Sequence, residues 1–411
     1  METVRQYASE RLDARGEVEA DAARRSHRDY YLRLSETAEP ELRGRDQIAW
    51  LDRLESEHDN LRAALGTALA DPDGPTAAMR LVVTLKEYWV ARGSSKEFAG
   101  VASALLERID TTIPPPLAVR TLITATYALW NAERYVAASA CGQRAVAAAQ
   151  ASGDDLLAAE AHTALGVALS KLGDARAIGH VDQAVHFARR TSDRRVLADA
   201  LWARGYDSTY RGSSDRAAGR ASSEESLALV RATGDLNGMS AALSTLAIMA
   251  MSDRDLTAAR RHLEEAADLD RQLGILPAIS TGEVNLGLLT VALRDYDAAG
   301  LHLTEALRVA RQLGERVSLA YILLGCALLA SGRGRHLRAA TLHGAADAAI
   351  QRLDLTFEPL EAGMRGDNHQ HLRATLGDAA FDLAYEQGHD LPLTAALTMS
   401  SETASSDVPD Q

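Results

Sequence analysis

Few residues of this sequence have the types and spacing that catalysis or metal binding requires. His369 and His371 could in principle bind a metal ion, but histidines two positions apart on a helix point to different faces. No nearby cysteine or carboxylate completes a ligand set, so we interpret them as a solvated polar stretch in a loop or at a helix end. His58-Asp59 suggests acid–base chemistry, yet no nucleophile accompanies it, and i to i+4 pairing in a charged helix explains both residues. We therefore predict no catalytic and no metal-binding residue, and we do not expect an enzyme.

A glycine-rich run, Gly332-Arg333-Gly334-Arg335-His336, superficially resembles a phosphate-binding loop. It lies between two helical patterns rather than after a strand, so we predict an ordinary turn between helices. The phosphate-loop motif Gly-x-x-x-x-Gly-Lys-Ser/Thr occurs nowhere in the sequence. No cofactor is therefore predicted.

The best functional candidate is a row of aromatic residues that would bind a ligand. Trp202, Tyr206 and Tyr210 are spaced by four residues, which aligns three amphipathic rings along one face of a helix. Two apolar residues of the next repeat, Ile248 and Met251, are expected to extend this row. The alternative is that the aromatic rings only pack between helical hairpins, and the sequence leaves both interpretations open. The predicted ligand-contacting or partner-contacting patch consists of Trp202, Arg204, Tyr206, Tyr210, Ile248 and Met251.

Arg204 belongs to this patch because it breaks a pattern. It stands where the equivalent helices of other repeats carry a leucine, such as Leu165 and Leu246. An unpaired buried charge is costly, so the guanidinium must find a carboxylate or turn outward. Asp199 and Asp207 are close enough in sequence to be its partners.

The elements that would position these residues recur every 40 residues or so. Asp215, Asp255 and Asp295 follow one another at intervals of 40, and so do Gly234, Gly274 and Gly314. Aspartate favours the beginning of a helix and glycine its end, so the two series mark alternating turns of stacked helical hairpins. The sequence therefore predicts an all-α fold, a right-handed α-solenoid, and such a stack is usually a binding surface.

Small residues occupy matching places in these hairpins. In the clearest unit, Leu286-Gly287 lies on the first helix, and Ala299, Leu303 and Ala306 lie on the second. This pattern resembles the tetratricopeptide repeat, with units of about 40 residues instead of the usual 34, over roughly residues 120–350. The resemblance implies protein or peptide binding along the concave side, which the first helices line.

Both ends of the chain resemble one class of bacterial proteins. Residues 1–12 (METVRQYASERL) are similar to the helix that closes the winged-helix part of STAND-class regulators, among them AfsR- and LuxR-type transcription factors. Residues 50–55 (WLDRLE) and 57–65 (EHDNLRAAL) resemble the segment that joins this module to its repeats. Residues 339–346 and 376–381 resemble the closing helices. The resemblance implies the sensor arm of such a regulator, lacking the ATPase and DNA-binding modules, which a longer or neighbouring protein would supply.

Composition agrees with this interpretation. The 411 residues are 46% hydrophobic but only 5% aromatic, which is typical of helices rich in alanine and leucine. A net charge of −13 opposes direct nucleic acid binding by this chain. Cys141 and Cys326 lie in apolar helical patterns and are expected to be small buried side chains in a reducing cytoplasm. No apolar run is long enough to cross a membrane, so we expect a cytoplasmic location.

The expected organisation follows from these patterns. Apolar residues from Gln47 to Leu69 recur at three- and four-residue steps, which predicts one long amphipathic helix. From Ser400 onward the sequence is polar, which predicts a disordered tail. The expected parts are a helix resembling the end of a winged-helix module (1–26), connecting helices (27–75), the repeat array (76–350), capping helices (351–399) and the tail (400–411).

The predicted function is non-catalytic protein–protein interaction and ligand sensing within a transcriptional regulator. The partner would be a protein or a peptide, with a small-molecule effector as a further possibility. The alternative is a free-standing adaptor with no link to transcription.

Overall fold

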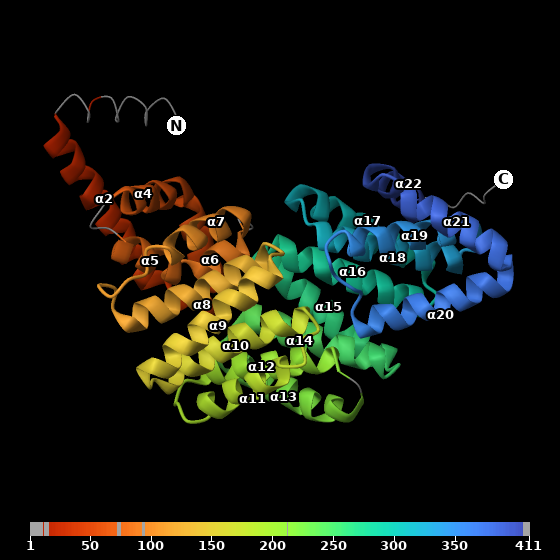
Figure 1. Ribbon diagram of the computed structural model, residues 1–411, viewed down its shortest axis with the longest axis horizontal. Coiled ribbons are helices and arrows are strands. Elements are labelled where there is room, and N and C mark those ends of the chain that lie inside the picture. Colours follow the sequence, from red (N-terminus) through yellow and green to blue (C-terminus); the bar gives the residue numbers. More distant parts are fainter. Residues whose placement is uncertain (1–10, 12–15, 72–74, 93–94, 212, 406–411) are drawn as a thin grey trace.

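The computed structural model describes residues 11, 16–71, 75–92, 95–211 and 213–405, and this part of the chain is built from helices and connecting turns (Figure 1). The predicted helix over residues 1–12 therefore lies almost entirely outside the described residues. Helices at the N-terminal end are α2 (Glu17–Ala38), the 3-10 turn η1 (Glu41–Arg43), α3 (Gln47–Ser56), α4 (His58–Ala70), α5 (Pro75–Thr84), α6 (Lys86–Ala91) and α7 (Ser95–Leu106).

Six helical hairpins follow and form the repeat array. Their pairs are α8 (Pro115–Asn131) with α9 (Tyr135–Ser152), α10 (Asp155–Lys171) with α11 (Ala177–Ala188), α12 (Arg194–Thr209) with α13 (Ser213–Thr233), α14 (Leu236–Ser252) with α15 (Leu256–Leu273), α16 (Leu276–Ala292) with α17 (Tyr296–Leu313), and α18 (Arg316–Gly332) with α19 (His336–Gln351). The predicted all-α array of hairpins is confirmed. Three further helices, α20 (Pro359–Leu376), α21 (Asp378–Asp390) and α22 (Leu393–Ser405), complete the described chain.

Two of the three predicted turn aspartates cap helices, whereas Asp215 lies inside α13. Asp255 and Asp295 precede α15 and α17 and accept hydrogen bonds from the backbone N–H groups of Ala258 and Ala298 at 3.0 and 3.2 Å. Such caps satisfy N–H groups that a helix leaves unpaired at its start. Gly274 and Gly314 end the same helices with a φ of 66°, a left-handed conformation that glycine adopts without strain.

Small residues let the two helices of a hairpin approach closely. Ala299, Leu303 and Ala306 of α17 are fully buried against α16. A methyl group added at Gly287 would lie 2.9 Å from the Leu303 side chain, so only glycine fits there. The turn predicted around Gly334 is also confirmed, because α18 ends at Gly332 and α19 begins at His336. Cys141 and Cys326 are free thiols and both are buried, as predicted.

Two predicted features are wrong. The single long helix from Gln47 to Leu69 is divided into α3 and α4 at Glu57, whose side chain accepts a hydrogen bond from the Tyr31 hydroxyl at 2.7 Å. The tail does not begin at Ser400, because α22 continues to Ser405 and packs on α17 and α18. Residues 406–411 lie outside the described part.

The array curves so that its two ends lie on the same side of the molecule (Figure 1). Contacts between distant parts hold this curvature. The Arg92 guanidinium donates to the carbonyl oxygen of Leu273 at 2.6 Å, and Glu133 accepts a hydrogen bond from the Val317 backbone N–H at 2.9 Å. The α8–α9 turn and the N-terminal helices thus contact hairpins far along the chain.

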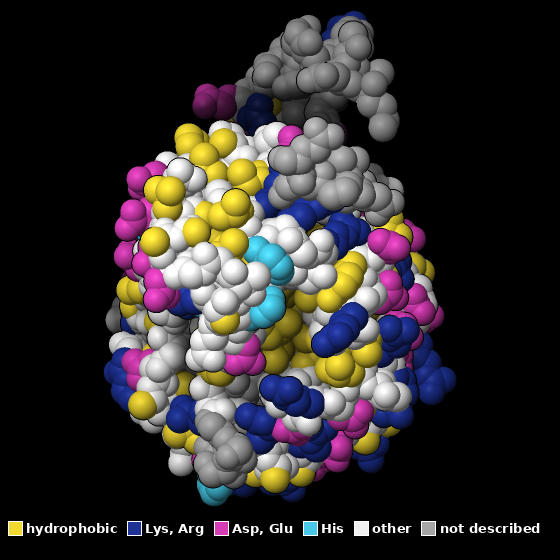
Figure 2. All heavy atoms as spheres, turned by 90° about the vertical axis from the view of Figure 1, so that its right-hand side faces the viewer, with side chains coloured by type: hydrophobic (Ala, Val, Ile, Leu, Met, Phe, Trp, Pro, Cys, Tyr) yellow, Lys and Arg dark blue, Asp and Glu magenta, His cyan; other side chains and the backbone are white. Residues whose placement is uncertain are grey.

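Viewed from the side of α20 and α21, the surface has a hollow in which apolar side chains are visible, with basic side chains gathered along one side (Figure 2). Among the described residues, no helix is both long enough and apolar enough to span a membrane.

Candidate functional site

A groove runs between the N-terminal helices and the first helices of the hairpins. It contains two adjacent cavities of about 360 and 260 Å³, which we name cavity A and cavity B. Both are lined by Arg43, Lys86 and Glu87, so these three side chains stand at the junction of the cavities. First helices α8, α10 and α12 supply the opposite wall. The groove therefore lies on the inner face where the sequence predicted binding.

Arg43 fixes the N-terminal helices to the array. It ends the short turn η1, and its guanidinium donates two hydrogen bonds to Asp199 at 2.7 Å each and forms an ion pair with Asp235 at 2.6 Å. Burial disfavours its charge, but the two carboxylates outweigh burial and hold the pKa of Arg43 well above its ordinary value. Burial likewise opposes ionisation of Asp199, yet Arg43 lowers the pKa of Asp199 overall.

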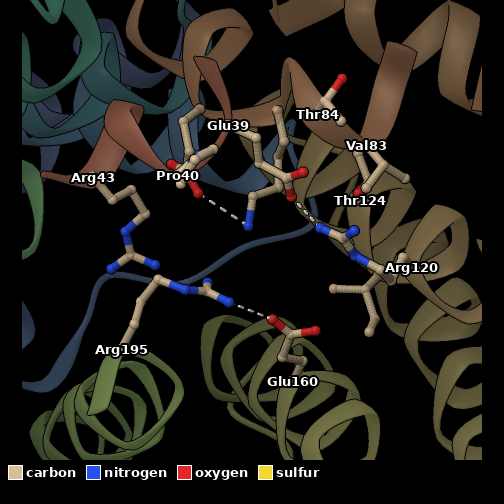
Figure 3. Close-up of a pocket in the computed structure, with 12 residues that line it drawn as sticks. Glu39, Pro40, Arg43, Val83, Thr84, Arg120, Thr124, Glu160 and Arg195 are labelled. Carbon is tan, nitrogen blue, oxygen red and sulfur yellow. Dashed lines mark hydrogen bonds and ion pairs between the residues drawn. The ribbon is translucent and has the colours of Figure 1, made fainter. Parts of the chain in front are cut away.

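Cavity A is lined mostly by charged side chains that pair with one another. Figure 3 shows Arg43 and Arg195 lying near each other at its edge, with Arg195 reaching from α12 to Glu160 of α10 at 3.0 Å. Arg120 of α8 pairs with Glu39 at the end of α2 on the other side. A ligand in cavity A would thus meet alternating positive and negative groups that are already oriented.

Cavity B is more apolar and has aromatic walls. Tyr127 and Trp130 of α8 and Trp202 of α12 line it together with Val167 of α10. The ammonium group of Lys86 lies 4.9 Å from the centre of the Tyr127 ring, a cation–π contact. The indole N–H groups of Trp130 and Trp202 are buried without a hydrogen-bond partner among the described residues. Buried donors normally have a hydrogen-bond partner, and a donor without one lowers stability. The two indole N–H groups at cavity B are therefore available to an acceptor on a ligand.

The six residues of the predicted patch do not form one surface. Trp202 lines cavity B and stacks on Tyr206 at a centroid distance of 5.6 Å. Tyr206 and Tyr210 continue the row away from cavity B, and their hydroxyl groups share a hydrogen bond of 2.7 Å. The four-residue spacing therefore placed the three rings in one row, as predicted.

Arg204 does not pair as predicted. Its Nε donates to Asp182 of α11 at 2.6 Å instead of reaching Asp199 or Asp207. Asp199 is held by Arg43, and Asp207 accepts hydrogen bonds from Ser170 at 2.8 Å and from Arg211 at 2.6 Å. Arg204 therefore contacts the second helix of the preceding hairpin and lines neither cavity A nor cavity B.

Met251 and Ile248 lie elsewhere along α14. Met251 is buried and lines a third cavity of about 430 Å³, cavity C, whose other walls include Pro359, Leu360 and Met364 of α20. Ile248 is half-buried and lines none of the three cavities. The inner face near α14 is thus covered by the chain's own helix α20.

The stretch His369–His371 lies inside a helix, and only its exposed members Gln370 and His371 are solvated as predicted. His369 lies inside α20 and packs edge-on against the rings of His343 and Phe381, at centroid distances of 4.5 and 5.2 Å. His371 points elsewhere, with its ring centroid 5.6 Å from that of His336. In the part of the chain that the structure describes, no group of three or more His, Cys, Asp or Glu side chains could hold a metal ion.

Sequence reasoning missed the residues that line the groove from the N-terminal side. Arg43 lies in a turn without any periodic pattern, and its partner Asp235 is 192 residues away. A signal did exist on the array side. Glu160 precedes Gly166 and Asp199 precedes Gly205 by the same six residues, so the repeat places both carboxylates on equivalent inner positions.

The chain is similar to known proteins over part of its sequence and over most of its fold. No protein-family model matches the chain. Proteins named "Putative HTH-type transcriptional regulator" from Mycobacterium bovis and Mycobacterium tuberculosis are 32% identical over 243 residues, which cover 57% of this chain and 26% of theirs. The match thus spans about a quarter of the length of these relatives.

Solved structures share the fold across most of the chain. A Rap protein complexed with competence and sporulation factor superposes with a TM-score of 0.56 at 11% identity, covering 93% of this chain and 99% of that one. Aspartyl phosphate phosphatase F from Bacillus subtilis gives a TM-score of 0.50 at 13% identity, with 92% and 96% covered. At these identities the likeness establishes the fold alone.

Proposed function

We propose that the chain is a non-catalytic domain of a transcriptional regulator, which binds a protein or peptide partner in the groove formed by cavities A and B. Cavity B is the observation that carries this proposal. It joins aromatic rings, a lysine ammonium group and two unsatisfied indole N–H groups in one recess. Aromatic walls with a few oriented polar groups are typical of binding sites.

The comparisons support the same class of function. A Rap protein that shares the fold was solved in complex with competence and sporulation factor, which supports the binding of a partner by such an array. The link to transcription rests on the mycobacterial relatives. In such a regulator, a partner in the groove would stabilise one curvature of the array, and Arg43 would transmit this change to the N-terminal helices. An ATPase or DNA-binding module that contacts the N-terminal helices would then respond to their change of position.

Partner capture tests this proposal. The full chain is immobilised, exposed to lysate of the native host, and the captured proteins and peptides are identified by mass spectrometry. Trp202→Ala and Tyr127→Ala should reduce capture of the groove partner at least tenfold. Tyr30→Ala removes an exposed ring on α2 and serves as the matched control, which should capture as well as the unaltered chain.

Two results would contradict the proposal. If both cavity variants keep their fold by circular dichroism and still capture every partner, the groove does not bind it. If groove-dependent partners include no component of a transcriptional regulator, the free-standing adaptor is favoured instead.

A further inference from the structure

The inner face holds a second cluster beside cavity B, centred on Lys171 at the end of α10. The Lys171 ammonium group lies 2.5 Å from a carboxylate oxygen of Glu358 and 5.9 and 5.6 Å from the ring centroids of Tyr135 and Tyr321. Burial disfavours this charge, but Glu358 outweighs it and holds the pKa of Lys171 above its ordinary value. A buried ammonium group that keeps its charge binds a carboxylate through a charge-assisted hydrogen bond.

The aromatic walls of cavity B continue into this cluster. On one side the ring of Trp130 contacts that of Tyr135 at a centroid distance of 6.3 Å. On the other side the ring of Trp202 stacks on that of Tyr206, whose helix borders the Lys171 cluster. Two ring contacts therefore connect the wall of cavity B with the Lys171 cluster.

The chain's own segment between α19 and α20 occupies the Lys171 cluster. Phe357 lies edge-on against Tyr321 at a centroid distance of 5.2 Å, and the neighbouring Glu358 binds Lys171. An aromatic side chain directly followed by a carboxylate is thus what the groove binds in this structure. Beyond Glu358, Pro359 and Leu360 cover cavity C.

Helix α20 is held to the array by the Arg365–Asp347 ion pair and by hydrogen bonds of Asn368 with His343 and Ser331. Its buried residues are Glu361 and Leu372, whereas α21 packs along α19 so closely that the Gly388 and Gly344 positions admit no side chain. One carboxylate oxygen of Glu361 is buried without a hydrogen-bond partner. An unsatisfied buried polar group is destabilising, so the seated position of α20 carries a penalty that release would remove.

We propose that the groove recognises an extended peptide segment of a partner protein in which an aromatic residue directly precedes an acidic residue, and that Phe357-Glu358 occupies this site until the partner displaces it. This inference rests on the proposed function and names the partner's chemistry. The partner's carboxylate would replace Glu358 on Lys171, and its flanking residues would extend into cavity B. A tethered segment competes with an effective concentration in the mM range, so an external peptide binds well only when the internal segment is weakened.

A labelled synthetic peptide with the sequence of residues 353–361 (LDLTFEPLE) is the probe for this proposal. Its binding to the full chain is measured by fluorescence anisotropy. Phe357→Ala/Glu358→Gln should bind the probe at least tenfold more tightly than the unaltered chain, because the internal competitor is weakened. Adding Lys171→Met to this variant should abolish the gain in affinity. A control probe in which glutamine replaces the glutamate that corresponds to Glu358 should bind the variant no more tightly than it binds the unaltered chain.

Equal, weak binding by the unaltered chain and the Phe357→Ala/Glu358→Gln variant would overturn the proposal. If that variant unfolds, Glu358→Gln alone keeps the side-chain volume and gives the same test. The outcome is separate from that of partner capture. Loss of capture in Trp202→Ala without any probe binding contradicts this inference alone, whereas unchanged capture in the cavity variants contradicts the proposed function.

Discussion

Lys171 and Glu358, 187 residues apart, form the ion pair that fastens the segment before α20 to the inner face of the array. Both side chains are largely buried, with 13% and 17% exposed. Removal of one partner of such a pair leaves the other charge uncompensated, which costs about 3 kcal/mol or more. Removal of both leaves no unpaired charge.

A double-mutant cycle on this pair should therefore show strong coupling. Lys171→Met and Glu358→Gln should each lower the free energy of unfolding, and the double variant should cost less than the two single losses together, with a coupling of about 1–3 kcal/mol. Urea unfolding followed by circular dichroism measures all four proteins. The exposed pair Arg176–Asp174 is the control and should show no measurable coupling. Additive losses at Lys171 and Glu358 would show that the pair does not fasten the segment.

Replacement of Arg43 by methionine should destabilise the protein in a pH-dependent way. The guanidinium holds Asp199 and Asp235, so its loss leaves the buried Asp235 without its ion pair and the half-buried Asp199 with only the more distant Arg195, which costs about 3–5 kcal/mol at neutral pH. The pKa of Asp199 is lowered in the folded chain, so its stabilising contribution is present above the unfolded pKa of about 3.9 and is lost as the pH falls through the folded value. The difference between Arg43→Met and the unaltered chain should therefore shrink between pH 6 and pH 3.

Thermal unfolding at several pH values checks this prediction. Asp235→Asn in the Arg43→Met background should restore part of the stability, because asparagine removes one unpaired charge and can still cap α14. A pH-independent loss would mean that Arg43 acts through packing of its aliphatic stem alone.

Glu361 should make the protein less stable as the pH rises. Burial raises the pKa of Glu361 to about 8, with the charge of nearby Glu358 adding to this effect and Lys171 opposing it. The unfolded chain releases this proton near pH 4.3, so the folded state binds more protons than the unfolded state between about pH 4.5 and 8. Stability contributed by the protonated carboxyl is thus present at low pH and is lost as the pH approaches 8.

Glu361→Gln removes this titration and should raise the melting temperature at pH 8 more than at pH 5. The expected gain at pH 8 is on the order of 1–3 kcal/mol, since the amide stays uncharged in the same place. Glu264→Gln on the exposed face of α15 is the control and should have no comparable effect. If Glu361→Gln destabilises the protein equally at both pH values, Glu361 is ionised in the folded chain.

The sequence was sufficient for those parts of the fold that depend on local rules. Asp255 and Gly274 lie at the two ends of one helix, and each acts through bonds and dihedral angles within a few residues. Their recurrence every 40 residues therefore predicted the array. The polar residues after Ser400 were misleading, because a serine or threonine in a helix can bond to its own backbone and then be buried. Ser400 does so by donating to the carbonyl oxygen of Ala396 at 2.9 Å.

The candidate site could be predicted only in part, because its two walls come from distant segments. The aromatic row on α12 follows from helical spacing alone. The contacts of Arg43 with Asp199 and of Glu358 with Lys171 join residues 156 and 187 positions apart, and no local pattern encodes such pairs. The curvature of the array brings them together.

Glycine substitutions should separate backbone strain from helix propensity in this array. Gly153 ends α9 with a φ of 69° and has no atom within 4 Å of an added methyl group, so Gly153→Ala should cost about 1 kcal/mol through strain alone. Gly66 lies inside α4 on an exposed face with equally open space, so Gly66→Ala should stabilise the protein by about 0.5–1 kcal/mol. Gly274→Ala should cost more than Gly153→Ala, because its methyl group would also come within 3.1 Å of the Arg92 guanidinium that bonds to Leu273. Urea unfolding should show Gly66→Ala as the most stable of the three variants, followed by Gly153→Ala and then Gly274→Ala. A loss at Gly66 as large as that at Gly153 would contradict the assignment of α4 as a regular helix.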